Sequence, residues 1–233
     1  MSLKALIFDV DGTLAETEEL HRQSFNDTFA AHGLDWQWDE ALYGDLLQTA
    51  GSRARLAVWM RDHLGRAPDP GLIAALYRTK TARYGRLLAG GGVQLRPGIA
   101  DLIDDAARAG LTLAVATSAG RVNVVALCDA VFGRPAFQVF DVIAAGDEVA
   151  ANKPAPDVYR LALKRLGLPP ADCVALEDSH IGVRAARAAG LAVLACPSHY
   201  TRHEDLSDAT QCVNTYTEIG GAADLAARLS TVA

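Results

Sequence analysis

Several apolar segments of this 233-residue chain end at side chains that could do chemistry. These side chains are carboxylates, hydroxyls and one ammonium: Asp9, Asp11, Thr117, Ser118, Lys153, Glu177 and Asp178. Taken singly, each has an ordinary structural explanation, such as an Asp-Gly turn, a hydroxyl that caps a helix or a lysine before a proline. In an open parallel sheet, however, ligands bind outside the carboxyl ends of the strands. If the apolar segments are strands, these side chains share one rim of the sheet, which indicates a functional site.

This set of residue types suits phosphoryl transfer. Mg²⁺ prefers oxygen ligands and is typically held by one or two carboxylates, which Asp9 and Asp178 would provide. The cation would lower the electrostatic barrier to attack by a carboxylate on a phosphate. Lys153 would balance the remaining negative charge, while the Thr117 hydroxyl and the Ser118 backbone N–H would hold phosphoryl oxygens. A magnesium-dependent phosphotransfer site is therefore the first functional hypothesis.

Asp9 and Asp11 are separated by one residue, and they can take different roles if their surroundings differ. Asp9, beside the metal, would stay ionised and attack phosphorus, which gives an aspartyl-phosphate intermediate. Asp11 would protonate the leaving oxygen and then accept a proton from the water that hydrolyses the intermediate. A carboxylate cluster for Ca²⁺ is the structural alternative, but the glycine-spaced loop of an EF-hand is absent from the sequence.

The elements that must position these residues alternate along the chain. Short apolar runs typical of buried strands alternate with stretches typical of helices. The predicted strands are 5–8, 111–117, 142–145, 173–176 and 191–195, and the predicted helices are 98–109, 122–130, 156–166 and 181–189. The alternation predicts an α/β fold, a doubly wound, Rossmann-like parallel sheet with helices on both faces.

Residues 16–90 break that alternation. They show helical periodicity, as in 21–32 and 52–64, but no buried strand. A glycine run at 90–92 and a turn at 96–98 lead back into the α/β pattern. We therefore predict a catalytic core of residues 1–15 and 91–233 with an inserted helical cap of residues 16–90, joined by two flexible crossings. Such a cap can open for substrate and close to exclude water; a helical excursion fixed to the core is the alternative.

The charge of the cap differs from that of the whole chain, which carries a net charge of −6. Residues 51–90 contain eight arginines and lysines against two aspartates, a local excess of six positive charges. This excess indicates an anionic ligand. A basic face that only meets solvent is the alternative.

Composition and patterning exclude several other classes of function. The acidic balance provides no broad positive field, so nucleic acid is not expected as a partner. No apolar run approaches the roughly 20 residues that cross a bilayer, so we expect no membrane partner. Asp9 and Asp11 follow the short N-terminal apolar run at once, and a secretory signal would exclude such charges there. The four cysteines do not have the spacing of metal ligands. We expect a cytoplasmic protein that acts on a small molecule; no feature indicates an oligomeric state.

The order and spacing of these motifs resemble those of the haloacid dehalogenase-like hydrolases. The first motif of that superfamily matches Phe8-Asp9-Val10-Asp11-Gly12-Thr13-Leu14, and the other three match Thr117-Ser118, Lys153-Pro154 and Leu176-Glu177-Asp178-Ser179. The resemblance covers essentially the whole chain. The helical insertion resembles the cap of the subgroup that contains β-phosphoglucomutases and phosphoglycolate phosphatases. Three stretches, 14–21, 141–147 and 200–204, are also similar to CbbY proteins.

The resemblance implies a role for each residue of the core motifs. Asp9 is the nucleophile and Asp11 the acid/base, while Thr117 and Lys153 complete the catalytic set. The implied Mg²⁺ is held by the Asp9 carboxylate, the Asp11 backbone carbonyl and Asp178. Glu177 lies nearby and contacts the metal through water.

Further residues are implied to bind the substrate together with Thr117, Ser118 and Lys153. Glu16 and His21 match family positions near the sugar, and Arg53 and Lys80 match basic positions that meet a distal phosphate. Gly51 belongs to the cap loop Thr49-Ala50-Gly51-Ser52-Arg53. This loop departs from the Thr-Gly-Gly-Lys type that is associated with CbbY proteins.

The CbbY resemblance implies a phosphatase, associated with Calvin-cycle carbon fixation, that converts xylulose-1,5-bisphosphate to xylulose 5-phosphate. One alternative is a sugar phosphomutase, in which a second sugar hydroxyl rather than water accepts the phosphoryl group. Another is a phosphatase of a different small phosphometabolite, such as phosphoglycolate. A non-catalytic binding protein on the same fold is disfavoured, because every charged or hydroxyl group that the mechanism needs is present.

Overall fold

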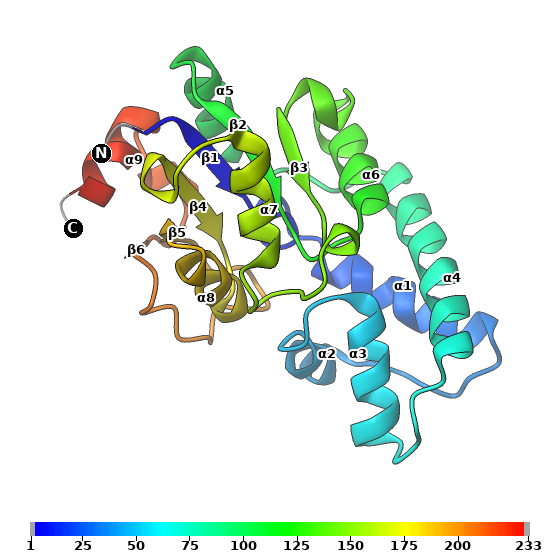
Figure 1. Ribbon diagram of the computed structural model, residues 1–233. Coiled ribbons are helices and arrows are strands. Elements are labelled where there is room, and N and C mark those ends of the chain that lie inside the picture. The colour runs from blue at the N-terminus through cyan, green and yellow to red at the C-terminus, as the bar shows by residue number, and fades with distance from the viewer. Residues whose placement is uncertain (1–2, 231–233) are drawn as a thin grey trace.

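The computed structural model describes residues 3–230, which contain a parallel sheet of six strands in the order β3-β2-β1-β4-β5-β6 (Figure 1). The strands are β1 (Ala5–Phe8), β2 (Thr112–Ala116), β3 (Val142–Ala144), β4 (Cys173–Glu177), β5 (Ala192–Ala195) and β6 (Gln211–Cys212). The strand order reverses at β1, with β2 and β3 on one side and β4 to β6 on the other. This arrangement is a doubly wound sheet with its switch point beside β1, so the predicted α/β fold is confirmed.

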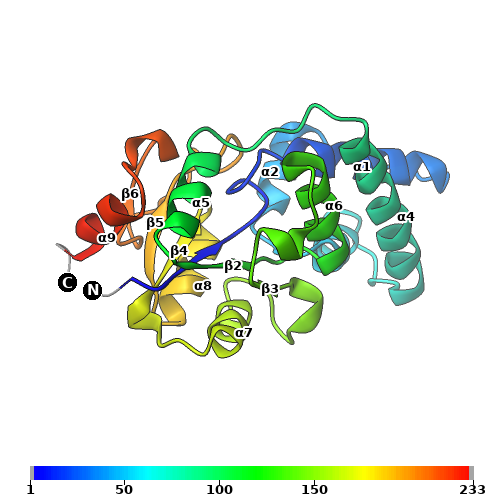
Figure 2. The same cartoon turned by 90° about the horizontal axis from the view of Figure 1, so that it is seen from above.

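The central strand β1 shows why helices cover both faces of the sheet. Its four residues are fully buried, with Leu6 and Phe8 in one hydrophobic cluster and Ala5 and Ile7 in the other. Successive side chains of a strand point to opposite faces, so each face needs its own apolar cover. The helices α5 (Ile99–Arg108), α6 (Arg121–Phe132) and α9 (Ala222–Ser230) cover the first face, and α7 (Asp157–Leu166) and α8 (His180–Ala188) cover the second (Figure 2).

The predicted strands agree with β1 to β5 to within one residue at each end. The sixth strand, β6, was not predicted. It is two residues long, partly exposed and made of a glutamine and a cysteine, so no apolar run marks it in the sequence. Short 3₁₀ helices lie in the connections: Ala136–Gln138, Gly146–Glu148, Pro170–Asp172 and Tyr216–Glu218.

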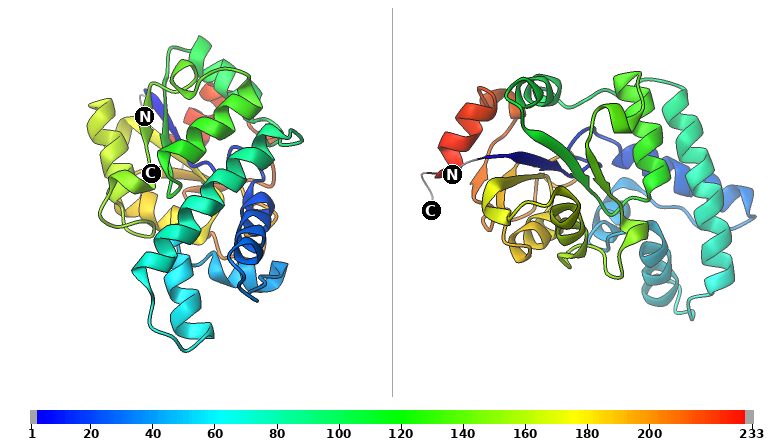
Figure 3. Two further views of the ribbon diagram at one scale, coloured as in Figure 1. Left: turned by 90° about the vertical axis from the view of Figure 1, so that its right-hand side faces the viewer. Right: turned by 45° about the horizontal axis from the view of Figure 1, so that its top comes forward.

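The described elements between β1 and α5 are all helical. They are α1 (Glu18–Ala31), α2 (Glu40–Leu46), α3 (Ser52–Val58), which continues into a π-helical turn (Trp59–His63), and α4 (Pro70–Ala89). α1 packs along α4, and the C-terminal end of α4 lies beside α6 (Figure 3). These helices enclose a core of their own, rich in aromatic residues such as Phe25, Trp38 and Tyr43. A separate core agrees with the predicted cap, and its bounds of residues 16–90 stay a prediction.

The two chain crossings between these helices and the sheet lie side by side. Ala15 forms an antiparallel bridge with Leu95. The next residue, Arg96, donates from its guanidinium to the carbonyl oxygens of Gly12 at 2.5 Å and of Pro197 at 2.7 Å. The crossings are therefore tied both to each other and to the loop after β5.

The longest described helix, α4, spans 20 residues and carries four basic side chains. Neither α4 nor any other helix within residues 3–230 has the length and apolar character needed to cross a bilayer.

Candidate active site

The polar side chains that follow the strands lie together at the carboxyl edge of the sheet. Asp9 follows β1, Glu177 ends β4, and Lys153 lies in the segment after β3. The Lys153 ammonium lies 2.5 Å from an oxygen of Asp9 and 2.6 Å from an oxygen of Glu177. Asp178 adds a third carboxylate, and ligand atoms of Asp9, Glu177 and Asp178 lie within 4.8 Å of one another. The structure thus brings the residues of the first, third and fourth motifs into one site.

These carboxylates are almost inaccessible to water, since Asp9, Glu177 and Asp178 are 6%, 0% and 4% exposed. Burial raises the pKa of Asp9 to about 8, although the neighbouring Lys153 opposes the rise. Burial and the nearby Asp9 and Glu177 raise the pKa of Asp178. Burial alone would lower the pKa of Lys153, but Asp9 and Glu177 raise it, so the lysine stays charged. The Lys153 ammonium pairs with two of the three clustered carboxylates, and a hard divalent cation would neutralise the remaining negative charge with the oxygen ligands it prefers.

Two glycines allow the carboxylates to approach this closely. Gly12 has a φ of +87°, and a Cβ at this position would collide with the carboxylate of Asp178. A Cβ on Gly182, in the first turns of α8, would collide with the carboxylate of Glu177. A side chain at either position would therefore displace an acidic residue of the site.

Asp11 is held by residues of α1 and α4 rather than by the sheet. The Thr17 hydroxyl donates to its Oδ1 at 2.5 Å, and His21 Nε2 lies 3.0 Å from the same oxygen. Lys80 Nζ contacts His21 Nδ1, and burial lowers the pKa of Lys80 to about 7. When Lys80 is charged it only donates, so Nδ1 then accepts and the Nε2–H donates to Asp11. Burial alone would raise the pKa of Asp11, but His21, Thr17 and Lys80 lower it. The helical segment thus holds Asp11 in its ionised form, which is the form that accepts a proton.

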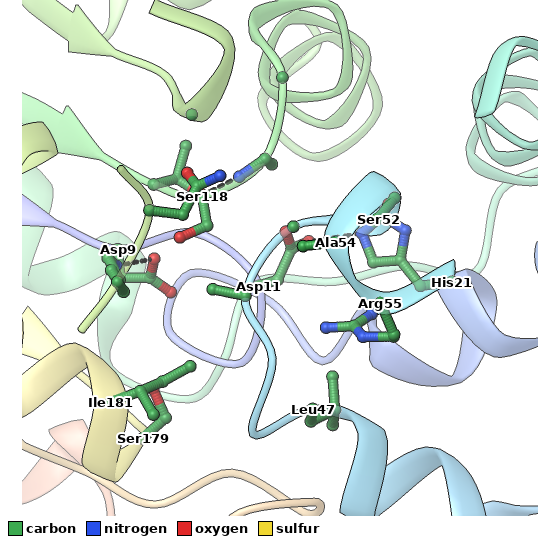
Figure 4. Close-up of a pocket in the computed structure, with 18 of the residues that line it drawn as sticks. Asp9, Asp11, His21, Leu47, Ser52, Ala54, Arg55, Ser118, Ser179 and Ile181 are labelled. Carbon is green, nitrogen blue, oxygen red and sulfur yellow. Dashed lines mark hydrogen bonds and ion pairs between the residues drawn. The ribbon is translucent and has the colours of Figure 1, made fainter. Parts of the chain in front are cut away.

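A cavity of about 360 Å³ separates the sheet edge from the helices. Figure 4 shows Asp9 and Ser118 on the sheet side and His21 and Arg55 on the helical side, with Asp11 between them. A cavity of this size falls in the range of small-molecule sites.

Two residues of the cavity wall each carry a buried polar atom without a hydrogen-bond partner in the described part of the chain. These atoms are the Ser118 Oγ and the Asn152 Oδ1. Buried polar atoms are usually satisfied, so both side chains keep unused hydrogen-bonding capacity beside the cavity. The neighbouring Thr117 accepts a hydrogen bond from the Ala119 N–H at 3.0 Å, which leaves its own hydroxyl hydrogen available.

The cavity wall includes two bases from residues 51–90, Arg53 and Arg55. The Arg55 guanidinium donates to the Tyr43 hydroxyl at 2.9 Å, and that hydroxyl donates to Glu18 at 2.7 Å. The Arg53 guanidinium lies 4.3 Å from the centre of the Tyr77 ring and forms no ion pair within residues 3–230. Arg53 therefore offers a positive charge that no acidic side chain of the described part of the chain neutralises.

Two predicted substrate residues lie away from the cavity wall. Glu16 sits at the chain crossing, where its carboxylate pairs with Arg96 at 3.2 Å. Lys80 is 1% exposed and lies behind His21. Direct contact of Glu16 or Lys80 with a substrate stays a prediction, and the structure gives each residue a different partner. Gly51, by contrast, lies in the wall as expected.

A family model for haloacid dehalogenase-like hydrolases matches residues 3–190. Protein CbbY from Cereibacter sphaeroides is 55% identical over 223 residues, which cover 96% of each chain. Protein CbbY from Rhodobacter capsulatus is 58% identical over 209 residues, which cover 90% of this chain and 92% of the relative. The chain belongs to the CbbY group of haloacid dehalogenase-like hydrolases. The resemblance predicted from the four motifs is confirmed.

A solved CbbY structure shares the whole fold. It is an aspartate-to-asparagine variant of CbbY from Rhodobacter sphaeroides in complex with xylulose-1,5-bisphosphate, with a TM-score of 0.92 and 54% identity. The match covers 96% of this chain and 99% of the other. The likeness therefore extends over the sheet and the helical segment alike.

Sequence reasoning missed several residues of this site. Glu18 lies in the cavity wall, and its spacing of three residues from His21 on α1 was an available signal, because such residues share a helix face. Thr17 precedes the same helix and donates to Asp11. Tyr159 of α7 donates its hydroxyl to Glu177 at 2.5 Å. Nothing in the local sequence distinguishes Tyr159 from an ordinary core tyrosine.

Proposed function

We propose that this protein is a magnesium-dependent phosphatase that removes one phosphate from xylulose-1,5-bisphosphate and releases xylulose 5-phosphate. The observation that carries the proposal is the environment of Asp9, a buried carboxylate 2.5 Å from Lys153 at the wall of the cavity. The bisphosphate bound to the similar CbbY protein supports the choice of substrate. Arg53, without an acidic partner on the opposite wall, supports a ligand with a second anionic group.

The acidic residues suit Mg²⁺ by type and by charge. The Asp9 and Asp178 carboxylates and the Asp11 backbone carbonyl would hold the ion, with Glu177 nearby. When bound, Mg²⁺ supplies positive charge that lowers the barrier between an anionic nucleophile and an anionic phosphate.

Asp9 performs the first chemical step by attacking phosphorus. The new bond joins an Asp9 oxygen to phosphorus, and the bond between phosphorus and the sugar oxygen breaks. Lys153 stabilises the charge on Asp9 and on the phosphoryl oxygens, and the Thr117 hydroxyl and the Ser118 N–H hold those oxygens. Water then attacks the aspartyl-phosphate, which releases inorganic phosphate and regenerates Asp9.

Asp11 moves the proton in both steps. It protonates the leaving sugar oxygen first and later accepts a proton from the attacking water. The hydrogen bonds from Thr17 and His21 favour ionised Asp11, so the arrangement observed suits the second step. For the first step Asp11 must carry a proton, which requires that these hydrogen bonds loosen.

Removal of the metal should silence the enzyme. EDTA is expected to lower phosphate release to background, and added Mg²⁺ should restore it, because no basic side chain within residues 3–230 pairs with Asp178. The measurement is inorganic phosphate released from xylulose-1,5-bisphosphate before and after Mg²⁺ is returned. Full activity after exhaustive chelation would remove the ground for a metal site at Asp178.

Loss of the unpaired cation in the cavity wall should reduce selectivity for the bisphosphate. Arg53→Ala is expected to lower kcat/KM for xylulose-1,5-bisphosphate by about 10-fold or more, as loss of a charge-assisted contact of roughly 1.5–3 kcal/mol implies. The same change should hardly alter turnover of a small aryl phosphate that cannot reach the helical wall. Comparison of the two substrates in steady state is the measurement.

Arg61→Ala is the matched control, because Arg61 is an exposed arginine of the same segment that pairs with Asp62. Equal losses for both substrates in Arg53→Ala would show that Arg53 does not meet a distal phosphate. Lys80→Ala separates two roles for Lys80. A loss confined to the bisphosphate would place it at the distal phosphate, and a loss with both substrates would place it behind Asp11.

A further inference from the structure

The loop of residues 198–204, which follows β5, contacts both the helical segment and Asp178. Its sequence is Ser198-His199-Tyr200-Thr201-Arg202-His203-Glu204, and residues 200–204 carry part of the CbbY resemblance. None of these residues has a role in the proposed reaction. Thr201 and Glu204 nevertheless line the cavity.

On the core side, the loop holds the predicted metal ligand Asp178. The Thr201 Oγ1 lies 2.7 Å from the backbone oxygen of Asp178 and 3.2 Å from its carboxylate Oδ2. Thr201 is itself fixed, because its Oγ1 accepts from the Ser198 N–H at 2.9 Å and lies 3.0 Å from the Ser198 hydroxyl. Both side chains are buried. The position of Asp178, at its backbone oxygen and at one carboxylate oxygen, is therefore linked to where the loop holds Ser198 and Thr201.

On the other side, the loop anchors the helices. Tyr200 is buried in the aromatic core of the helical segment, with its ring edge-on to Tyr43 at 5.7 Å between ring centres. Its hydroxyl donates to Glu19 of α1 at 2.7 Å. His199 Nε2 lies 2.7 Å from a carboxylate oxygen of Glu40 in α2. Two consecutive loop residues thus bind two different helices.

Tyr200 and Thr201 are neighbours in the chain, so their positions are mechanically linked. A planar peptide unit joins them and keeps their Cα atoms about 3.8 Å apart, so a shift of Tyr200 with the helices also moves Thr201. Glu204 also connects the helical segment to the segment that carries Asp178. One of its carboxylate oxygens accepts a hydrogen bond from the Gln48 side chain at 2.7 Å. The other accepts from the backbone N–H of His180 at 2.5 Å, and His180 is the first residue of α8, two residues after Asp178.

We infer that the 198–204 loop couples the docking of the helical cap to the geometry of the metal site, with Tyr200 and Thr201 as positioning residues. The docked cap holds Tyr200, and Thr201 then holds Asp178 in the orientation that binds the metal. This inference rests on the proposed magnesium-dependent function. Since coupling between two sites is reciprocal, metal binding must in turn stabilise the docked cap.

The test measures Mg²⁺ binding to the 233-residue chain by calorimetry, without substrate. Tyr200→Phe keeps the ring but removes the hydroxyl that donates to Glu19, and it touches no predicted metal ligand. We expect this variant to bind Mg²⁺ about 5-fold more weakly, at the lower end of typical coupling between sites. Thr201→Val should weaken binding at least as much. The double variant should be weaker by less than the product of the two single effects, because both act through one link.

Tyr216→Phe and Thr79→Val are the matched controls. The Tyr216 hydroxyl is buried with no hydrogen-bond partner within residues 3–230, and the Thr79 hydroxyl lies 2.9 Å from His32 Nε2, within the helical segment. Both controls should bind Mg²⁺ as the wild type does. If Tyr200→Phe fails to fold, as judged by circular dichroism, Glu19→Gln weakens the same contact from the other side and should shift the affinity in the same direction.

Tryptophan fluorescence provides a second measurement that does not depend on activity. The three tryptophans of the chain, Trp36, Trp38 and Trp59, all lie in the aromatic core that Tyr200 enters. Mg²⁺ should change their emission in the wild type and in both controls, and this change should be reduced in Tyr200→Phe and Thr201→Val.

Wild-type affinity and an unchanged emission response in Tyr200→Phe and Glu19→Gln would overturn the coupling. Weakened Mg²⁺ binding in Thr201→Val alone would also overturn it, since Thr201 would then be only a local support of Asp178. A wild type that binds no Mg²⁺ at all would instead contradict the proposed function itself.

Discussion

Asp9→Asn is expected to lower kcat for xylulose-1,5-bisphosphate by more than about 10⁴-fold, the scale seen when a nucleophile is removed. The amide that replaces the carboxylate lacks the negative charge that attacks phosphorus and is a weaker ligand for Mg²⁺. Phosphate release in saturating Mg²⁺ is the measurement. Retained phosphatase activity in this variant would contradict the assignment of the nucleophile.

Two controls separate lost chemistry from lost structure. Asp172→Asn makes the same change at a residue that precedes β4 and pairs with Lys4 at 2.7 Å, away from the site, and it should leave kcat near that of the wild type. Asp9→Asn should melt at or above the wild-type temperature in metal-free buffer. It removes one of three clustered buried carboxylates, of which only Asp9 and Glu177 pair with Lys153 within residues 3–230, so the excess negative charge falls.

Asp11→Asn should produce the second large effect, and that effect should depend on the leaving group. Loss of a general acid typically costs about 10²- to 10⁴-fold, and sugar phosphates with poor leaving groups should lose the most. Activated aryl phosphates need less protonation, so their rate of enzyme phosphorylation should fall less. Single-turnover rates of the phosphorylation step, measured with both substrate types, provide the test.

This variant is informative because it preserves the hydrogen bonds to the helices. The amide oxygen of asparagine can still accept from Thr17 and His21, which lie 2.5 Å and 3.0 Å from the present carboxylate oxygen. The change in rate then reports proton transfer and not a loosened cap. Equal losses of phosphorylation rate with both substrate types would argue against Asp11 as the acid.

The sheet could be predicted because fully buried strands have apolar side chains on both faces. Residues 5–8 and 173–176 are continuous apolar runs of this kind, and the strands found there begin at the predicted residues. The aromatic core of the helical segment has no comparable pattern in any short stretch of the sequence. Phe25, Trp38 and Trp59 meet only when α1, the chain after it and α3 pack together, so no single window of sequence contains their contact.

The same difference separates the two halves of the site. Asp9, Thr117 and Asp178 directly follow strands, so the sheet fixes where they lie, and their convergence followed from the strand prediction. Lys80 and His21 are 59 residues apart on α4 and α1. Their contact depends on how these helices cross, which periodicity does not determine. The family resemblance assigned Lys80 to a distal phosphate, and that contact stays a prediction, while the structure places the Lys80 side chain against His21.

The central claim is that Asp9 carries the phosphoryl group during turnover, and an acid quench of the working enzyme tests it most directly. Wild-type protein mixed with Mg²⁺ and xylulose-1,5-bisphosphate, quenched within a turnover and digested, should yield a peptide with one added phosphoryl group on Asp9. Mass spectrometry would locate that group, and the modified peptide should be absent from Asp9→Asn. Continued turnover with no phosphorylated intermediate, or with the group on another residue, would contradict the account.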